Sequence, residues 1–218
     1  MYWDWSTAGE FNSDGTPIVK YDSLGNIIYL SKKGSFQWEN NVKPEYLWFK
    51  GEARHYLMGD KVDSTSPVQL NSLLGSYQEK NSQIIPVKVH RGKQIFDTEN
   101  NTMIMPHLFG QDSTAYWKAY NWDRAAEAGM RSVGLPYSGK YSFVSTEMYW
   151  PINHMVAPAE ESLNCEDCHS RESRLGNLAG FYLLGRDSNR LIDILGFGLI
   201  IMAFSGVVVH SILRATKK

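Results

Sequence analysis

Cys-Glu-Asp-Cys-His, residues 165–169, is the stretch around which this chain is organised, and it holds both cysteines of the 218 residues. Thiols at this spacing on a helix can bond the two vinyl groups of one haem, and the histidine that follows can reach its iron. A zinc site needs four ligands, and a thioredoxin-like dithiol does not need the histidine. The motif therefore predicts covalent haem c on Cys165 and Cys168, with His169 as the proximal iron ligand. The alternative is a chance dithiol on a surface helix.

A second stretch, ILGFGLIIMAFSGVVVHSIL at residues 194–213, contains no formally charged residue. With a rise of about 1.5 Å per residue, a helix of this length crosses a hydrocarbon core of about 30 Å. The chain then ends in RATKK, and basic clusters favour the cytoplasmic side of a membrane. We therefore expect a single-pass transmembrane helix with a short basic cytoplasmic tail at residues 191–218. The main domain would lie on the periplasmic side of the cell membrane.

The overall charge and the first residues add two expectations. Lysine and arginine number 22 and aspartate and glutamate 23, which gives a formal net charge of -1 and no indication of nucleic-acid binding. The chain begins MYWDW, without the basic and apolar regions of a secretory signal. We infer that the numbered chain lacks its true start, either as a fragment of a longer translocated protein or as one half of a split gene.

The first half of the chain shows the pattern of short strands and turns. Ile18–Tyr21 and Ile27–Leu30 flank a polar turn, as in a β-hairpin. Helical signals begin near Asp112, where a helix is expected to reach Tyr120. A second helix is expected from Trp122 to Val133, before Gly134.

These patterns predict an α-rich fold with short β-hairpins, few long elements and one transmembrane helix at the C-terminus. Pro158 and the acidic residues after it predict that the CEDCH motif lies on a helix. We expect a cytochrome domain at residues 1–175 and a glycine-rich connector at residues 176–190.

A low-spin haem needs a second axial ligand, usually histidine or methionine. His154 and His107 are the main candidates because each lies in an apolar segment with a neighbouring proline. Either could instead be a core histidine bonded to a backbone carbonyl. His90 is a further candidate, although its polar setting, like that of His55, favours a solvated or hydrogen-bonded role. Met148 and Met155 are possible alternatives, but methionine more often fills a core.

Two features of the apolar stretch suggest more than a simple anchor. His210 lies inside it, and an ionisable group at membrane depth is a candidate cofactor ligand or quinone-site group. Its position one turn before Arg214 also fits a place among the lipid headgroups. Gly196, Gly198 and Gly206 would let another helix approach closely, which favours a membrane partner.

Several long segments resemble the C-terminal part of the octahaem tetrathionate reductase family, multihaem cytochromes c related to hydroxylamine oxidoreductase. They are GSFQWENNVKPEYLWFKG (34–51), HRGKQIFD (90–97), MPHLFGQDSTAYWKAYNWD (105–123), AGMRSVGLPYSGKYSFVSTEMYWPINHMVAP (128–158) and CEDCHSR (165–171). The resemblance covers most of residues 1–175 and implies a fold of the multihaem cytochrome c type.

The resemblance also implies roles for individual residues. Cys165, Cys168 and His169 would hold the last haem of the family, and His107 and His154 would be distal ligands to this haem or to a neighbouring one. Family members carry eight haems, one of them catalytic with a lysine on its iron, whereas this chain contains one binding motif. Catalysis is therefore not assigned to this chain alone.

Three functions remain open at this point. The first is a membrane-anchored subunit, not itself catalytic, that transfers electrons between a multihaem cytochrome c subunit and a quinone-linked or cytochrome b-like membrane subunit. The second is the C-terminal fragment of an octahaem reductase that acts on small sulfur or nitrogen oxyanions. The third is a mainly structural anchor in which the haem is incidental.

Overall fold

The computed structural model describes residues 1–40, 42–153 and 158–216. Internal contacts divide the chain into two units, Met1–Val156 and Ala157–Lys218.

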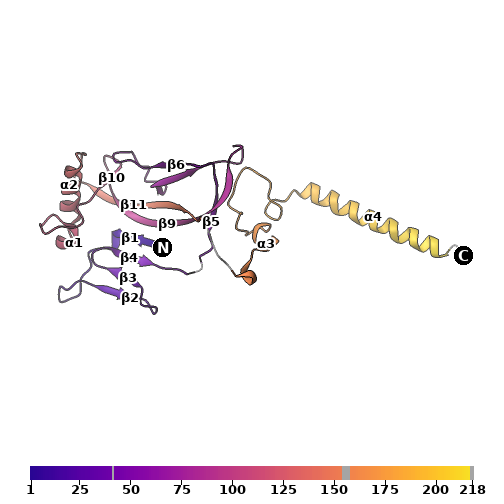
Figure 1. Ribbon diagram of the computed structural model, residues 1–218, viewed down its shortest axis with the longest axis horizontal. Helices are drawn as coiled ribbons and strands as arrows, with labels where there is room; N and C mark the ends of the chain where they lie inside the picture. Colours follow the sequence, from indigo (N-terminus) through magenta and orange to yellow (C-terminus); the bar gives the residue numbers. More distant parts are fainter. Residues whose placement is uncertain (41, 154–157, 217–218) are drawn as a thin grey trace. The chain divides into compact units, whose positions relative to one another are not determined.

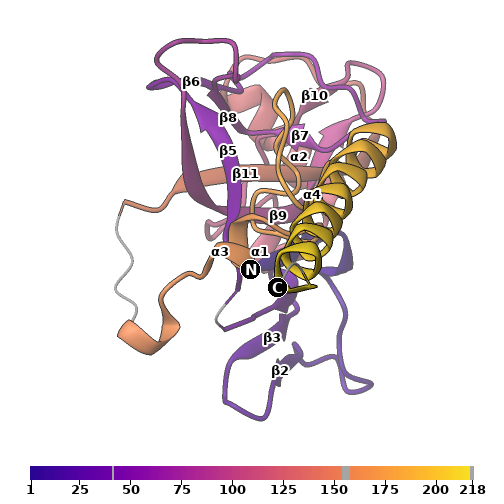
Figure 2. The same cartoon turned by 90° about the vertical axis from the view of Figure 1, so that its right-hand side faces the viewer.

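The first unit is built on one large mixed sheet (Figure 1). Its strands run in the order β2-β3-β4-β1-β9-β11-β7, and β5 and β10 also pair with β9. A second, small sheet contains β6 and β8, which lie beside β5 (Figure 2). The strands are β1 Tyr2–Asp4, β2 Val19–Tyr21, β3 Ile27–Leu30, β4 Gly34–Gln37, β5 Glu45–Phe49, β6 Glu52–His55, β7 Val68–Gln69, β8 Asn71–Leu74, β9 Gln83–Asp97, β10 Thr102–Met103 and β11 Tyr141–Pro151.

Strand β9 is the centre of the sheet. Over its 15 residues it pairs with β1 in parallel and with β5, β10 and β11 in antiparallel orientation. Its pairing with β11 is continuous from Tyr141 opposite Asp97 to Pro151 opposite Val87. The ladder is reinforced by Arg91, whose guanidinium binds Glu45 on β5 at 2.6 Å and Glu147 on β11 at 2.9 Å.

The expectation of an α-rich fold is wrong, because the first unit is rich in strands and has few helices. The predicted hairpin is present as β2 and β3, but β9 and β11 are much longer than any strand expected there. Their stability comes from pairing partners far away in the sequence, which local hydrophobic patterns do not report. Pro86, Gly92 and several charged residues also interrupt the apolar pattern of β9.

Adjacent residues of β9 serve two different cores. Because successive side chains of a strand point to opposite faces, Ile95 and Phe96 enter separate apolar clusters. The cluster around Ile95 contains buried residues from the helical segment, and the cluster around Phe96 contains residues from neighbouring strands and loops. The first comprises Ile104, Tyr116, Trp122, Ala125, Ala126 and Met130, and the second Val62, Val68, Met103 and Val144.

Two helices, α1 (Tyr116–Ala119) and α2 (Trp122–Ser132), lie together at one end of this sheet (Figure 1). The side chain of Asn121 caps α2 by accepting a hydrogen bond of 2.9 Å from the backbone N–H of Arg124. The buried residues of α2 recur at helical spacing, which places one apolar face on the core. The helix predicted at 122–133 is therefore confirmed, whereas the one expected from Asp112 is reduced to the single turn of α1.

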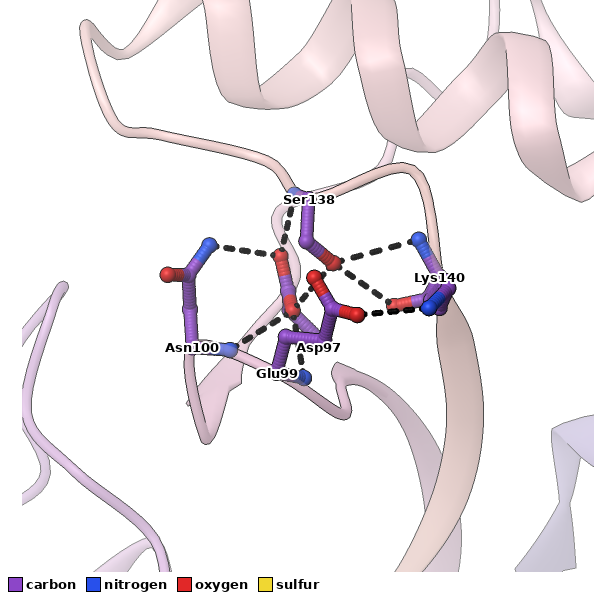
Figure 3. Close-up of polar contacts among 5 residues, drawn as sticks. All are labelled: Asp97, Glu99, Asn100, Ser138 and Lys140. Carbon is purple, nitrogen blue, oxygen red and sulfur yellow. Dashed lines mark hydrogen bonds and ion pairs between the residues drawn. The ribbon is translucent and has the colours of Figure 1, made fainter.

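A buried carboxylate, Asp97, joins the end of β9 to the loop before β11 (Figure 3). It accepts hydrogen bonds from the backbone N–H groups of Glu99, Asn100 and Ser138 at 3.0, 2.9 and 2.7 Å. The side chains of Asn100 and Ser138 donate two more, at 2.9 and 2.7 Å. Burial alone would raise the pKa of Asp97, but these hydrogen bonds outweigh it and lower the pKa to about 2.

The second unit consists of short elements followed by one long helix. A 3-10 turn, η2 (Ala159–Glu161), precedes α3 (Cys165–Cys168), and α4 runs from Arg190 to Thr216. The two cysteines lie on a helix as predicted, but this helix is only one turn long. Ser162 is extended and separates it from η2, and His169 leaves the helical conformation directly after Cys168. Helix α4 contains residues 194–213, and by length and composition it could cross a membrane. None of its described residues is buried within the protein.

Candidate haem-attachment site

Local hydrogen bonds shape the turn that carries the motif. The backbone N–H of Asn164, just before α3, donates to the Asp167 carboxylate at 2.9 Å. This is the side-chain half of a capping box, and it places negative charge at the helix N-terminus. His169 leaves the helix at φ −110°, ψ 51°, and its N–H donates to the Cys165 carbonyl at 2.8 Å. The motif is therefore held as one closed turn.

The chemistry of the donor set fits covalent haem. Cys165 is exposed, Cys168 is half-buried, and neither forms a disulfide. Their spacing of three residues places both on one side of the turn, and the exposed His169 follows at once. Among the described residues, no group of three or more His, Cys, Asp and Glu side chains is arranged to hold a metal ion. Two accessible thiols beside one imidazole thus match thioether attachment with a proximal histidine, and do not match a four-ligand zinc site.

A neighbouring segment folds back onto this turn. The backbone N–H of Arg174 donates to the Asp167 carbonyl at 2.8 Å, and its Nε lies 3.8 Å from the Asp167 carboxylate. Asp167 therefore contributes both to the start of α3 and to the chain reversal after it. This role of Arg174 could not be seen from the sequence, because nothing in the order of residues shows that the chain reverses there.

The candidate distal ligand His107 lies in the first unit, in the loop between β10 and α1. Its backbone is fixed on both sides, because its N–H donates to the Ala125 carbonyl and its carbonyl accepts from Tyr116, each at 2.9 Å. Gly129 permits this contact with α2, because a Cβ at this position would lie 2.7 Å from the backbone nitrogen of His107. The position of His107 is thus set by the helix that covers it.

The imidazole of His107 is about one-third exposed (35%), and its Nε2 lies 3.1 Å from Asp112 Oδ2. Hydrogen bonds from Thr114 and then from His107 lower the pKa of Asp112. Asp112 is therefore a carboxylate at neutral pH and able to orient the ring. Binding of iron through Nε2 would require this contact to open, whereas binding through Nδ1 would leave Asp112 as a partner that raises the basicity of the ligand.

His90 lies on β9, opposite Met148 of β11, and its half-buried ring is 6.1 Å from that of Trp150 between centroids. It lines a cavity of about 500 Å³ together with Lys88 and Arg91. Burial lowers the pKa of His90, and the positive charges of the amino terminus and Lys88 add to the effect. The neutral imidazole is therefore favoured, which is the form that binds metals.

The remaining histidines are placed as follows. His154 lies outside the described residues, so its role as a distal ligand stays a prediction. His55 is exposed at the end of β6, and His210 is exposed on α4. His107 and His90 belong to the first unit and the motif to the second, and the ligation of any iron by these two residues also stays a prediction.

Comparison with known proteins gives two matches. The family described as "Cytochrome c bacterial" matches residues 1–172, a range that includes the whole CEDCH motif. The crystal structure of octaheme cytochrome c from Shewanella oneidensis matches with a TM-score of 0.72 and 41% sequence identity over 83% of this chain. The match covers 42% of that protein, so this chain spans less than half of its length. No match is found among the curated proteins.

Proposed function

Because the chain belongs to the bacterial cytochrome c family, we propose that it is a membrane-anchored electron-transfer subunit with one haem c at residues 165–169. Covalent haem c and electron transfer are the family's chemistry. The observation that carries the proposal is the single turn of α3, with two accessible thiols and an adjacent histidine. Bound there, a haem supplies a centre that gains and loses one electron.

In this proposal each residue of the motif has one task. The thiols of Cys165 and Cys168 would hold the haem covalently through two thioether bonds. His169 would be the proximal ligand, and the hydrogen bond from its backbone N–H to the Cys165 carbonyl keeps it in the same turn. These residues would thus attach and orient the cofactor, and His107 or His154 would be the second histidine ligand.

Bis-histidine ligation leads to the first prediction. Replacing the distal ligand should convert one haem from low spin to high spin, since a sixth ligand is lost. We expect this result for His107→Ala or His154→Ala, measured in the visible and electron paramagnetic resonance (EPR) spectra of the purified complex. His55→Ala, at an exposed position on β6, is the matched control. Unchanged spectra for both His107→Ala and His154→Ala would contradict bis-histidine ligation by these residues.

The proposed partner on the soluble side is a multihaem cytochrome c. Support comes from the 41% identity to an octaheme cytochrome of which this chain spans less than half. Only one CxxCH motif is present among these 218 residues. In the separate-subunit proposal, the further haems of a continuous electron path are carried by a partner polypeptide, and His107, His154 or His90 could also ligate one of them.

The proposed membrane partner binds α4, with the cytochrome portion at residues 1–175 on the periplasmic side. Support comes from the length and apolar composition of α4 and from the fact that none of its described residues is buried within the protein. A quinone-reactive subunit would connect the haem to the quinone pool. Native membranes should then yield a complex whose haem at Cys165–His169 is reduced by a quinol, and a haem that quinol never reduces would contradict this arrangement.

The second prediction concerns the glycine-bearing face of α4. A Cβ at Gly206 meets nothing within 4 Å in the chain itself, so a larger residue there should disturb only a partner helix. Gly206→Leu should reduce recovery of the complex in detergent. The control is Ile201→Phe, a bulky change at an exposed position of the same helix. Equal recovery of both variants would indicate that α4 is a simple anchor.

A second candidate function is that this chain is the C-terminal part of an octahaem reductase acting on small sulfur or nitrogen oxyanions. The same octaheme match favours this candidate, because the region matched in the Shewanella oneidensis protein is part of a longer polypeptide. Mass spectrometry of the native polypeptide separates the two candidates. Seven further CxxCH motifs on the same polypeptide would support the reductase, and an intact mass of 218 residues plus one haem would support the separate subunit.

A further inference from the structure

The loop between α3 and α4 is organised around one arginine. The side chain of Arg186 is 18% exposed, and its guanidinium donates to the carbonyl oxygens of Gly176 at 3.3 Å, of Leu178, and of Phe181 at 2.8 Å. Its Nε and a terminal nitrogen bind the two carboxylate oxygens of Asp187 at 2.8 and 2.7 Å. One planar side chain thus satisfies three backbone carbonyls and one carboxylate, a geometry that lysine cannot reproduce.

Further contacts within the loop stabilise the hydrogen bonds of Arg186. Asp187 also accepts a hydrogen bond of 2.7 Å from the backbone N–H of Leu183. Leu183 and Leu178 are buried, with 3% and 5% exposure. The guanidinium carbon of Arg186 lies 5.5 Å from the ring centroid of Phe181, within the range of a cation–π contact. The loop is therefore an ordered structure and not a simple spacer.

This loop touches the CEDCH motif through Gly185, the residue before Arg186. Gly185 has φ +92°, and a Cβ built there would lie 2.3 Å from the carbonyl oxygen of His169 and 2.7 Å from its carbonyl carbon. The backbone of Gly185 is thus in direct contact with the backbone of His169. Any shift of the Arg186 network would be transmitted to the residue that is proposed as the proximal ligand.

We propose that Arg186 is a positioning residue for His169: it holds the loop so that Gly185 packs on the His169 backbone and fixes the orientation of the imidazole toward the haem. The inference rests on the proposed function, because it requires a haem at the CEDCH motif. It concerns residues beyond 172, where the family match ends. Residues that contact the metal ligands commonly set the orientation of these ligands and the redox potential of the metal. A residue that holds His169 in place would therefore affect the haem as well as the stability of the loop.

The test compares four variants of the full chain, purified with its haem in the native complex. Arg186→Met removes the network, and Arg186→Lys keeps the charge without the planar fork. Gly185→Ala acts on His169 directly and leaves Arg186 intact. Arg171→Met, at an exposed position close to the motif, is the control for loss of one positive charge. The readouts are haem staining on a denaturing gel, the EPR spectrum of the ferric haem and its reduction potential.

We expect Arg186→Met and Gly185→Ala to retain haem staining but to broaden or shift the EPR signal and to change the reduction potential. The EPR signal and reduction potential of Arg186→Lys should lie between those of these two variants and those of the wild type. Arg171→Met should keep the wild-type EPR signal. A wild-type EPR signal for Arg186→Met would overturn the proposal, as would an equal change in Arg171→Met. If Arg186→Met does not assemble, Arg186→Lys decides, because it removes the planar fork and keeps the charge; a wild-type EPR signal for Arg186→Lys would then overturn the proposal. A wild-type protein without haem staining would overturn the proposed function itself.

Discussion

Replacing both Cys165 and Cys168 with alanine should abolish covalent haem in this protein, and each single replacement should lower it strongly. No other cysteine exists in the chain, so no thiol can substitute for the missing thioether bonds. A haem held only by its axial ligands dissociates when the protein unfolds, whereas a thioether-linked haem stays with the polypeptide. Haem staining after denaturing electrophoresis therefore measures the attachment directly.

The matched control for this experiment is Glu166→Gln, which changes a charge between the two cysteines and leaves both thiols in place. Glu166 is exposed, and we expect this variant to retain wild-type haem staining. Because bound haem stabilises the folded state, the double cysteine variant should also unfold at a lower temperature. Covalent haem that persists in the double variant would contradict the assignment of the motif.

Replacing Asp97 with asparagine should produce the largest loss of stability in the first unit. The fully buried carboxylate accepts five hydrogen bonds, and in asparagine one of its oxygens becomes a donor facing other donors. The fall in the pKa of Asp97 from 3.8 to about 2 corresponds to about 2 kcal/mol of stability at neutral pH. For a protein of this size, this is about 4–8 °C in unfolding temperature.

The pH dependence of this effect has a definite sign. The pKa of Asp97 is lower in the folded state, so its contribution is present above about pH 4 and disappears as the pH falls toward about 2. The difference in the free energy of unfolding between the wild type and Asp97→Asn, measured with urea, should therefore shrink as the pH falls over this interval. Asp14→Asn is the control, since Asp14 accepts similar bonds from Thr16 at an exposed site. Equal stability of wild type and Asp97→Asn at pH 7 would contradict the account of this network.

The amino-acid sequence was sufficient to predict those elements whose structure is determined by residues close together in the chain. Helix α2 follows from the cap at Asn121, the apolar period and Gly134, and the β2–β3 hairpin from the turn at Asp22, which accepts hydrogen bonds from the N–H groups of Leu24 and Asn26. The CEDCH motif itself could be recognised because its chemistry depends on spacing within five residues. Helix α4 was visible as an uninterrupted apolar stretch.

The amino-acid sequence was not sufficient to predict those features that form where segments distant in the chain come together. The length of β9 depends on β1, β5 and β11, and strand pairing between residues 34 to 89 positions apart leaves no local pattern. Asp97 was missed for the same reason, since its partner Ser138 lies 41 residues away. Arg186 was missed because its partners, at most ten residues away, are brought to it by an irregular loop that has no periodic sequence pattern. Their importance comes from partners that only the folded chain brings to them.

The most direct test of this account is the position of the iron atoms in the purified native complex, determined by electron cryo-microscopy or by anomalous diffraction. We predict one haem with thioether bonds to Cys165 and Cys168 and with His169 on its iron, next to further haems carried by a partner polypeptide. A structure in which Cys165, Cys168 and His169 bind no haem would contradict the central claim. Further haems on the same polypeptide would instead support the octahaem reductase.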